Sequence, residues 1–377
     1  MARKLKSDKL LFTATLLLVC TSVVMVYSAS AVMAAQDWNN PYLFLFKQAT
    51  WALLGLLIVQ LIMRIDYHHY RQPVVIYTAL AIVCIALIAV LFGRPVKGAN
   101  RWLHVLGLGV QPSELAKLCV VVFVAALLER RMERIDEPAH ALVPIGGVLG
   151  VVVGLILIQP DLGTAVSIVT IVAVMIFAAG INYRYVTGLA LVALPTLGVL
   201  IWTSEYRWKR VTAFMDPWKD PLGDGFQMIQ SMIAVSTGGI FGRGLMAGVQ
   251  KLFYLPEPHN DFIYAVISEE LGLVGATVLL ACFCVITWRG LRTAMRAPDR
   301  FGAFLALGLT TMVAFQAFFN VSVVLGLLPT KGIPLPFVSY GGSSLLINLV
   351  GMGILLNVSQ HASASRVVTV ALQPADA

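Results

Sequence analysis

The sequence predicts an all-α polytopic membrane protein with about ten transmembrane helices, and three observations support this prediction. Hydrophobic residues make up 59% of the 377 residues and charged residues only 12%, whereas soluble domains are about 45–50% apolar and about 25% charged. The mean hydropathy is +0.84. The apolar runs are long and unbroken, unlike the alternating strands of about ten residues that build an outer-membrane barrel.

Each expected span is an apolar run bounded by polar breaks, and a span needs about 20 such residues. The runs lie at about 10–33, 47–65, 73–92, 113–128, 141–159, 163–180, 186–203, 262–287, 301–326 and 343–360. The first run is too long for the apolar core of a signal peptide, so we expect an uncleaved helix. The chain is therefore predicted to form a single membrane domain over residues 1–377, with short tails at about 1–9 and 361–377.

Basic residues predict the orientation of these spans. If the N-terminus is cytoplasmic, the tails and cytoplasmic connections carry 15 Lys and Arg residues and the outer side carries 11, six of them in one long loop at about 204–261. Long loops count little for topology, and without this loop the ratio is 15 to 5. We therefore expect both termini in the cytoplasm and a large outer loop between spans seven and eight. The net charge of +8 is then explained by topology and requires no nucleic acid.

Three connections on the outer side are rich in Gly, Pro and aromatic residues, at 93–112, 204–261 and 327–344. Such composition is typical of loops and short re-entrant pieces. Because long irregular segments are usually functional, we expect any chemistry at this outer face.

Charged residues within or beside the spans are the first candidates for function, because a charge in a span costs about 2.5–3.5 kcal/mol on insertion scales. Glu114 and Lys117 share one helix face at the start of the fourth span. They form either a neutralising structural pair or a site in which Lys117 faces an anionic substrate and Glu114 orients it. Asp161 follows Pro160 between the fifth and sixth spans, where it either caps the next helix or contacts the substrate.

The densest polar cluster lies in LPEPHNDFIYAVISEELG, residues 255–272. Asp261 stands where the long loop enters the eighth span, and a partly desolvated carboxylate there is suited to act as a general base; the alternative is an interfacial helix cap. His259 and Asp261 could ligate a cation, but two ligands are a weak metal signal, and the sequence assigns no metal site. We expect Glu269 and Glu270, two turns deeper, to be structural, with one of them bonded to a neighbouring helix.

The outer basic residues, Lys331 among them, are either anchors for lipid headgroups or, if gathered near Asp261, a cationic mouth for a phosphate or pyrophosphate. Ser343 and Ser344 precede the tenth span. Their hydroxyls, together with free N–H groups at a helix start, suit an oxyanion, whereas the flexibility of the adjacent Gly-Gly pair is the alternative explanation of this segment.

Five motifs spread along the chain carry a family resemblance. They are GANRWL (98–103), QPSELAKL (111–118), QPDLGT (159–164), LPEPHNDFIYAVISEELG (255–272) and GLLPTKGIPLPFVSYGGSSLL (326–346). With them the chain resembles the SEDS family, the FtsW/RodA peptidoglycan glycosyltransferases. PTKG at 329–332 looks more like FtsW than RodA, while GIPLPF at 332–337 also fits RodA-like sequences. Asn260, where many relatives have Thr, and Pro258 depart from the pattern.

This resemblance implies a ten-span fold and polymerisation of lipid II, the undecaprenyl-pyrophosphate-linked disaccharide peptide, at the outer face of the cytoplasmic (inner) membrane. The catalytic aspartate of the family carries over to Asp261, the arginine of its RW motif to Arg101, and its Glu/Lys pair to Glu114 and Lys117. We expect Asp161, His259, Lys331, Ser343 and Ser344 to join them in binding the substrate.

The substrates that the resemblance supplies fix the chemistry. The donor sugar is α-linked and the product is β-linked, so a single inverting displacement with one general base is sufficient. The pyrophosphate leaving group needs positive charge, for which Arg101, Lys117 and Lys331 are candidates. A divalent cation, Mg²⁺ or Mn²⁺, is a further source of charge, and no other cofactor is expected.

For the FtsW branch, the resemblance implies a division-specific partner and a position at the division septum. The partner is a class B penicillin-binding protein transpeptidase of the FtsI type, with FtsQ, FtsL and FtsB as divisome regulators. A RodA-type elongation polymerase and a lipid II flippase are alternatives. Against a flippase, the sequence shows no inverted repeat, and its polar residues gather on one face. A third alternative is a scaffold that only positions the transpeptidase.

Overall fold

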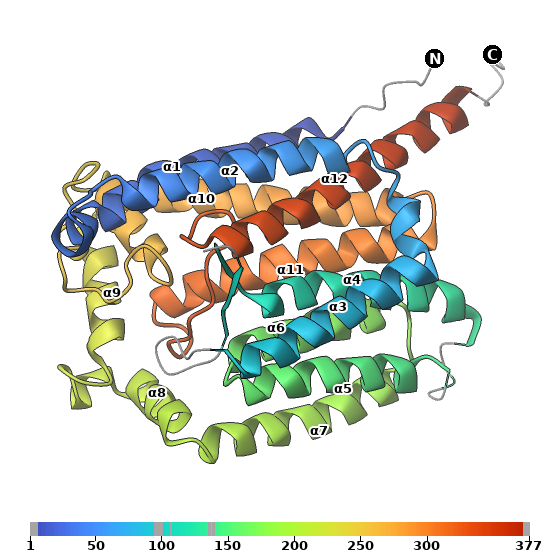
Figure 1. The fold of residues 1–377 in the computed structure, drawn as a ribbon, viewed down its shortest axis with the longest axis horizontal. Coiled ribbons are helices and arrows are strands. Elements are labelled where there is room, and N and C mark those ends of the chain that lie inside the picture. Colours follow the sequence, from blue (N-terminus) through green and yellow to red (C-terminus); the bar gives the residue numbers. More distant parts are fainter. Residues whose placement is uncertain (1–6, 94–100, 106–107, 135–136, 138–139, 372–377) are drawn as a thin grey trace.

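The computed structural model describes residues 7–93, 101–105, 108–134, 137 and 140–371. Parts of both expected tails, and the first three residues of the GANRWL motif, lie outside these ranges. Long helices lie side by side along one direction (Figure 1). This is the arrangement expected in lipid, where a helix satisfies every backbone hydrogen bond within its own segment.

Ten helices of 17 or more residues form the body of the described chain. They are α1 (Lys9–Trp38), α2 (Leu43–Ile62), α3 (Pro73–Leu91), α4 (Pro112–Arg131), α5 (Leu142–Ile158), α6 (Leu162–Ala178), α7 (Tyr183–Trp202), α10 (Ile263–Arg296), α11 (Arg300–Val324) and α12 (Gly342–Ala371). Each coincides with one of the ten predicted runs.

Among the described residues, seven of these helices are long and apolar enough to cross a membrane, namely α1, α2, α3, α7, α10, α11 and α12. Helices α5 and α6 are apolar but have only 17 residues, and α4 carries five charged residues. The predicted all-α polytopic membrane fold is confirmed, whereas the exact number of spans stays a prediction.

Shorter elements connect the long helices. They are η1 (Tyr67–Arg71), β1 (Leu103–Val105), β2 (Leu108–Val110), η2 (Met132–Arg134), α8 (Glu205–Met215), η3 (Pro217–Lys219) and α9 (Phe226–Thr237). The two strands form an antiparallel hairpin in which Leu103 pairs with Val110. The expected long loop at 204–261 is thus partly helical, because it contains α8, η3 and α9.

Helix starts follow ordinary capping chemistry. Asp8 accepts hydrogen bonds from the N–H groups of Leu10 and Leu11 at the start of α1, and Asp299 caps α11. Pro73 and Pro112 occupy first-turn positions of α3 and α4, where the missing N–H costs nothing. These caps explain why the predicted runs and the observed helices agree closely.

Helices α11 and α12 lie at the centre of the bundle, whereas no residue of α7 is buried, in keeping with its place at the edge (Figure 1). Small residues allow close contacts in this core. A Cβ added at Gly351 of α12 would lie 3.3 Å from Met312 of α11, and one at Gly308 of α11 would lie 2.6 Å from Val121 of α4. Such close packing is the main source of helix association in lipid.

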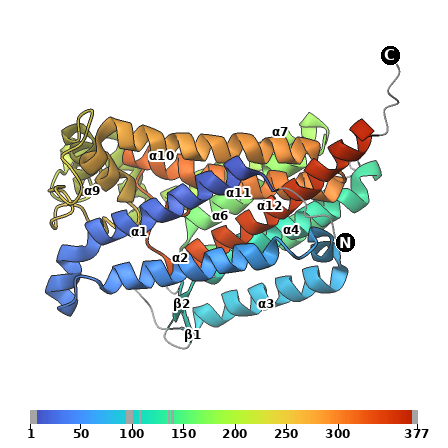
Figure 2. The same cartoon turned by 90° about the horizontal axis from the view of Figure 1, so that it is seen from above.

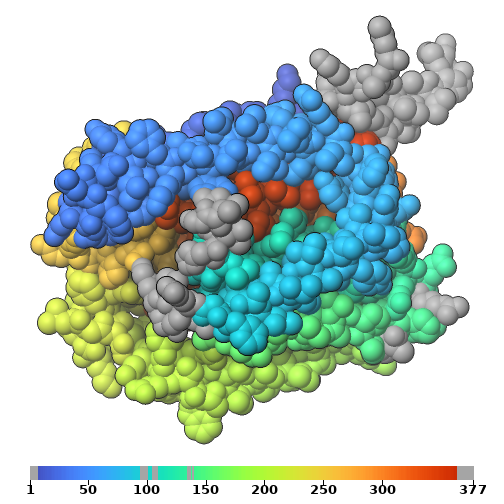
Figure 3. All heavy atoms as spheres, viewed as in Figure 1, coloured from blue at the N-terminus to red at the C-terminus, as the bar shows by residue number. Residues whose placement is uncertain are grey.

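The two ends of the bundle differ in character. Helix α1 begins and α12 ends at the same end (Figure 1), where Arg289 of α10 donates to Asp8 at 2.6 Å and the N–H of Tyr67 donates to Asn357 of α12 at 3.1 Å. Helix α9 and the loop before α10 gather at the opposite end (Figure 2). On one side of the molecule the surface is hollowed between α2 and α3, and α12 is visible at its base (Figure 3).

Candidate active site

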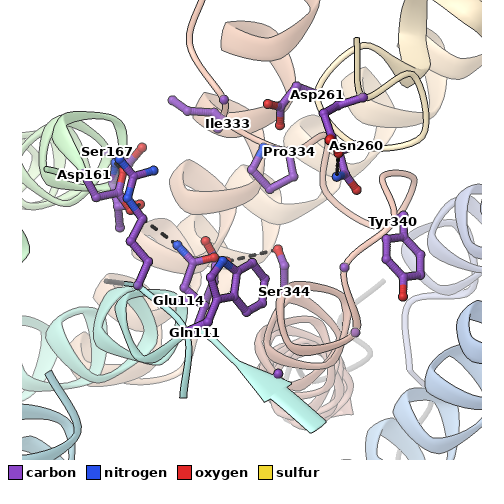
Figure 4. Close-up of a pocket in the computed structure, with 18 of the residues that line it drawn as sticks. Gln111, Glu114, Asp161, Ser167, Asn260, Asp261, Ile333, Pro334, Tyr340 and Ser344 are labelled. Atoms are coloured by element: carbon purple, nitrogen blue, oxygen red, sulfur yellow. Dashed lines mark hydrogen bonds between the residues drawn. The ribbon is translucent and has the colours of Figure 1, made fainter. Parts of the chain in front are cut away.

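A cavity of about 570 Å³ collects most of the sequence-predicted site residues, and this volume lies within the usual range for small-molecule sites, about 300–1,000 Å³. Its walls come from α2, the hairpin, α4, α6, α8, the loop before α10, the segment between α11 and α12, and the start of α12. The charged residues that line it are Lys47, Arg101, Glu114, Lys117, Asp161, Glu257 and Asp261. Loops and helix ends that are far apart in the sequence therefore meet around one space (Figure 4).

The start of α4 supplies the floor of this cavity. The Lys117 ammonium lies 2.8 Å from the Glu114 carboxylate, and each side chain is only 3% exposed. Ser344 of α12 donates to the second oxygen of Glu114 at 3.1 Å. The predicted i,i+3 pair is therefore present, and its burial makes each partner dependent on the other for charge neutralisation.

Asp161 caps α6, as one of the two readings of the sequence expected. Its carboxylate accepts from the N–H of Thr164 at 3.3 Å and from the Thr164 hydroxyl at 2.7 Å, while Gln111 donates to it at 3.4 Å. The guanidinium of Arg101 is held beside this cap, because it donates to the carbonyls of Gln159 at 3.1 Å and Pro160 at 2.5 Å. Arg101 and Asp161 both line the cavity, where Arg101 is partly exposed and Asp161 is only 3% exposed.

Lys331 approaches the same corner from the segment between α11 and α12. A Cβ added at Gly163, in the first turn of α6, would lie 2.8 Å from Cε of Lys331. Burial lowers the pKa of Lys331 from 10.5 to about 8, an effect that Asp161 opposes and that Arg101, Arg210 and Arg207 reinforce. Basic residues therefore gather at the start of α6. The sequence predicted such a cationic site only as an alternative to anchors for lipid headgroups.

Asp261 stands on another wall, held through its backbone. Asn320 of α11 donates one amide to the carbonyls of Asp261 and Ile333, each at 2.8 Å, and Ser339 donates to the carbonyl of Asn260 at 2.6 Å. Helix α10 begins at Ile263 with no side-chain hydrogen bond at its N-cap. The N-cap position is thus Phe262, one residue after Asp261, and Asp261 lines the cavity.

Gly332 fixes the position of that carboxylate. A Cβ at Gly332 would lie 2.7 Å from Oδ2 of Asp261, so Gly332→Ala must push the carboxylate aside. Because a misplacement of about 1 Å can cost about a hundredfold in rate, we expect the turnover of this variant to fall by up to about a hundredfold with its folding intact. Gly341→Ala is the matched control, since its nearest neighbour would lie at 3.7 Å. Equal rates for the two variants would contradict the prediction.

Three predicted substrate contacts are not lining residues of the cavity, namely Lys331, described above, and His259 and Ser343. His259 is only 4% exposed, and its ring packs against Phe44 at 5.0 Å and Tyr340 at 5.5 Å. Ser343 is buried and accepts from the N–H of Gln111 at 3.3 Å. Neither is a lining residue, whereas Ser344 is. Both therefore support the wall of the cavity, and direct contact of either residue with the substrate stays a prediction.

Sequence reasoning missed an entire wall of the cavity. Lys47 and Trp51 of α2, Trp102 of the hairpin, and Tyr340 line it. Gln111, which lies next to the predicted charges in the QPSELAKL motif, could have been found from its position. Nothing in the apolar run of α2 distinguishes Lys47 and Trp51 from residues that face lipid or the membrane interface.

A second buried cluster fastens the loop that carries Asp261. Glu270 lies 2.6 Å from the Lys251 ammonium and accepts from Ser28 of α1 at 2.7 Å, while Glu269 accepts from the N–H of Val249 at 2.8 Å. The prediction that one of these glutamates bonds to a neighbouring helix is confirmed. No group of three or more His, Cys, Asp or Glu side chains in the described ranges is placed to hold a metal ion, so the cation considered above has no such ligand set there.

Comparison with known proteins gives consistent matches along nearly the whole chain. Residues 8–364 match the family model for FtsW, RodA and SpoVE, described as cell cycle protein. The chain is 44% identical to the probable peptidoglycan glycosyltransferase FtsW of Geobacter sp. (strain M18), over 93% of this chain and 96% of that protein. It is 42% identical to stage V sporulation protein E of Bacillus subtilis (strain 168), over 95% and 98% of the two chains.

Solved structures share the fold. A chain of a peptidoglycan synthase complex, solved to explain the structural coordination of polymerization and crosslinking, superposes with a TM-score of 0.77 at 31% identity, over 94% of this chain and 98% of that one. The rod shape determining protein RodA of Thermus thermophilus superposes with a TM-score of 0.70 at 28% identity, over 94% and 97% of the two chains.

Proposed function

The chain belongs to the FtsW/RodA/SpoVE family of cell cycle proteins, and on that basis we propose that it is a peptidoglycan glycosyltransferase that polymerises lipid II into glycan strands. One observation carries the proposal beyond the family name. The Asp261 carboxylate lines the same cavity as Arg101, which stands beside Lys331 at the start of α6. A proton acceptor and a cationic site for a leaving group therefore share one space.

The reaction needs few groups from the protein. Asp261 takes the proton of the acceptor hydroxyl as that oxygen attacks the anomeric carbon of the donor. The bond from the anomeric carbon to the pyrophosphate breaks, and the polyprenyl pyrophosphate leaves with the electron pair. Arg101 and Lys331 stabilise the negative charge that develops there. Lys117 contributes less than the sequence indicated, because its charge is already neutralised by Glu114.

The pKa of Lys331 gives this assignment a pH signature. The free ammonium titrates at about 8, so the site holds an anion best below this pH and loses the charge as pH rises through it. We expect kcat/KM for the donor, which reports the free enzyme, to fall between pH 7 and pH 9. Lys331→Arg should keep its charge over this range, so its kcat/KM should fall much less between pH 7 and pH 9. An equal fall in kcat/KM for Lys331→Arg and the wild type would reject the role of Lys331.

The same proposal includes the topology. In the described chain, the end where α1 begins and α12 ends also carries most of the basic connections, among them Arg64, Arg71, Arg130, Arg131, Arg184, Arg289, Arg292, Arg296 and Arg300. The positive-inside rule places this end in the cytoplasm. The ten long helices then all span the membrane, both termini are cytoplasmic, and the cavity opens near the outer face of the inner membrane.

We further propose that the chain acts in septal wall synthesis with a class B penicillin-binding protein of the FtsI type, regulated by FtsQ, FtsL and FtsB. The FtsW relatives, at 44% identity, support the division branch over the RodA branch, at 28%. A related chain occurs in a peptidoglycan synthase complex in which polymerization and crosslinking are coordinated, which supports a transpeptidase partner.

Polymerisation of lipid II in liposomes tests the proposal directly. The purified chain, with its co-purified transpeptidase, should extend lipid II into glycan strands that separate as a ladder. Moenomycin is included to suppress contaminating glycosyltransferases of the classical type. An intact complex that forms no strands, but moves labelled lipid II between leaflets, would overturn the polymerase in favour of a flippase.

A further inference from the structure

Two aromatic residues that line the cavity, Trp51 and Tyr340, have no role in the reaction as described so far. Trp51 of α2 and Tyr340 of the segment before α12 both line the cavity and are both partly exposed. Buried aromatic side chains in a membrane bundle need no cavity to pack well. Two aromatic faces that reach a polar cavity are instead available to a ligand, since an aromatic ring combines a large apolar face with tolerance of a wet surface.

Both rings are held rigidly. A Cβ added at Gly342 would lie 2.2 Å from Nε1 of Trp51, so the indole packs directly on the turn that starts α12. Tyr340, two residues earlier, meets Phe44 edge-on with ring centroids 4.9 Å apart, and its N–H donates to the carbonyl of His259 at 2.9 Å. Phe44 and Trp51 lie two turns apart on α2, so a single helix face fixes both rings against one turn.

Arg101 and Asp161 mark one side of the cavity, the cationic side, and Trp51 and Tyr340 mark the other, the aromatic side. Lys47 of α2 also lines the aromatic side, with its ammonium 6.0 Å from the centre of the Phe44 ring. In Figure 4, Tyr340 lies on the opposite side of the cavity from Asp161, and Asp261 lies between them. Arg101 belongs to the Asp161 side, because it donates to the carbonyl of the preceding Pro160. The proton acceptor therefore stands between a cationic side and an aromatic side.

We propose that Trp51 and Tyr340 form the platform that binds the acceptor sugar, an inference that rests on the proposed function. In an inverting displacement the attacking hydroxyl and the leaving group lie on opposite faces of the donor sugar. With the pyrophosphate at the cationic side, the acceptor approaches from the aromatic side and brings its hydroxyl to Asp261. The C–H groups on a sugar face carry small positive charges, which the negative face of an aromatic ring attracts.

Two substrate analogues separate acceptor binding from donor binding. The donor analogue is lipid II with its acceptor hydroxyl capped, so that it can only donate. The acceptor analogue carries the same disaccharide peptide on a linkage without pyrophosphate, so that it can only accept. Each pair gives one coupling event, and the KM of each substrate is measured by varying it at a saturating level of the other. The enzyme is used as the full chain with its partner in liposomes.

We expect Trp51→Ala to raise the acceptor KM about five- to tenfold, the size of a lost aromatic contact, and to leave the donor KM unchanged. Trp51→Tyr, which keeps a ring, should stay near wild type. Trp288→Ala is the matched control, because Trp288 lies on α10 beside Arg289 and Arg292 and away from the cavity. If Trp51→Ala fails to fold, Tyr340→Leu carries the same test.

An unchanged acceptor KM in a folded, active variant, or an equal rise in both KM values, would overturn the platform while leaving the polymerase intact. A wild-type enzyme that forms no coupled product from the two analogues but polymerises lipid II would also overturn it, since the acceptor would then be recognised through its pyrophosphate. A wild-type enzyme inactive on lipid II itself would contradict the proposed function.

Discussion

Replacing Asp261 by asparagine should remove polymerisation, with a fall in kcat of at least about 10²–10⁴-fold, the usual contribution of a general base. Asparagine has nearly the same shape but cannot take the proton of the acceptor hydroxyl. Its backbone carbonyl would still accept from Asn320, and Ser339 would still hold the neighbouring Asn260. Folding and partner binding should therefore remain close to wild type.

Glycan ladders from matched amounts of the two enzymes, each with its partner, measure this effect. Asp224→Asn is the control, because Asp224 is an exposed carboxylate in the same outer segment and does not line the cavity. This control should polymerise at the wild-type rate. Wild-type activity in Asp261→Asn would remove the base from the mechanism and raise the scaffold alternative, in which Asp261 is replaceable.

The second large effect concerns stability. Glu114→Gln would leave the ammonium of Lys117 buried without its 2.8 Å partner, and the loss of one member of a buried ion pair costs about 3–5 kcal/mol. Lys117→Met should destabilise the protein similarly by stranding the carboxylate. The double variant Glu114→Gln with Lys117→Met buries no net charge and should regain most of the lost stability. Thermal unfolding in detergent, followed for all four proteins, gives the coupling between the two sites.

The activity of the double variant decides between the two readings of this pair. If the charges face the substrate, the stable double variant stays inactive; if the pair is only structural, activity returns with stability. Glu205→Gln serves as the control, since Glu205 and Lys209 form an exposed pair at 2.8 Å on α8 whose loss should leave the unfolding midpoint unchanged. Single variants as stable as wild type would show that the buried pair is not coupled.

The sequence alone determined the helical framework and the residues with the strongest chemistry. Because lipid cannot hydrogen-bond a backbone, each long apolar run must form a helix, and all ten runs do. Charges such as Asp261, Glu114 and Asp161 were found because a charge near a span is costly. The spacing of Glu114 and Lys117 within one helix also predicted their contact, since neighbours three residues apart always share a face.

Only the tertiary structure decided which of these side chains meet, and which wall each one faces. Trp51 and Lys47 belong to an apolar run that is hydrophobic all round, so no pattern along α2 marks the face that turns to the cavity. His259 and Ser343 lie within the right motifs but pack behind the wall, because the turn before α12 seats against α2 and the loop of Asp261. Contacts between residues more than 200 positions apart, such as Glu114 with Ser344, depend on helix packing, which small residues and shape control in lipid.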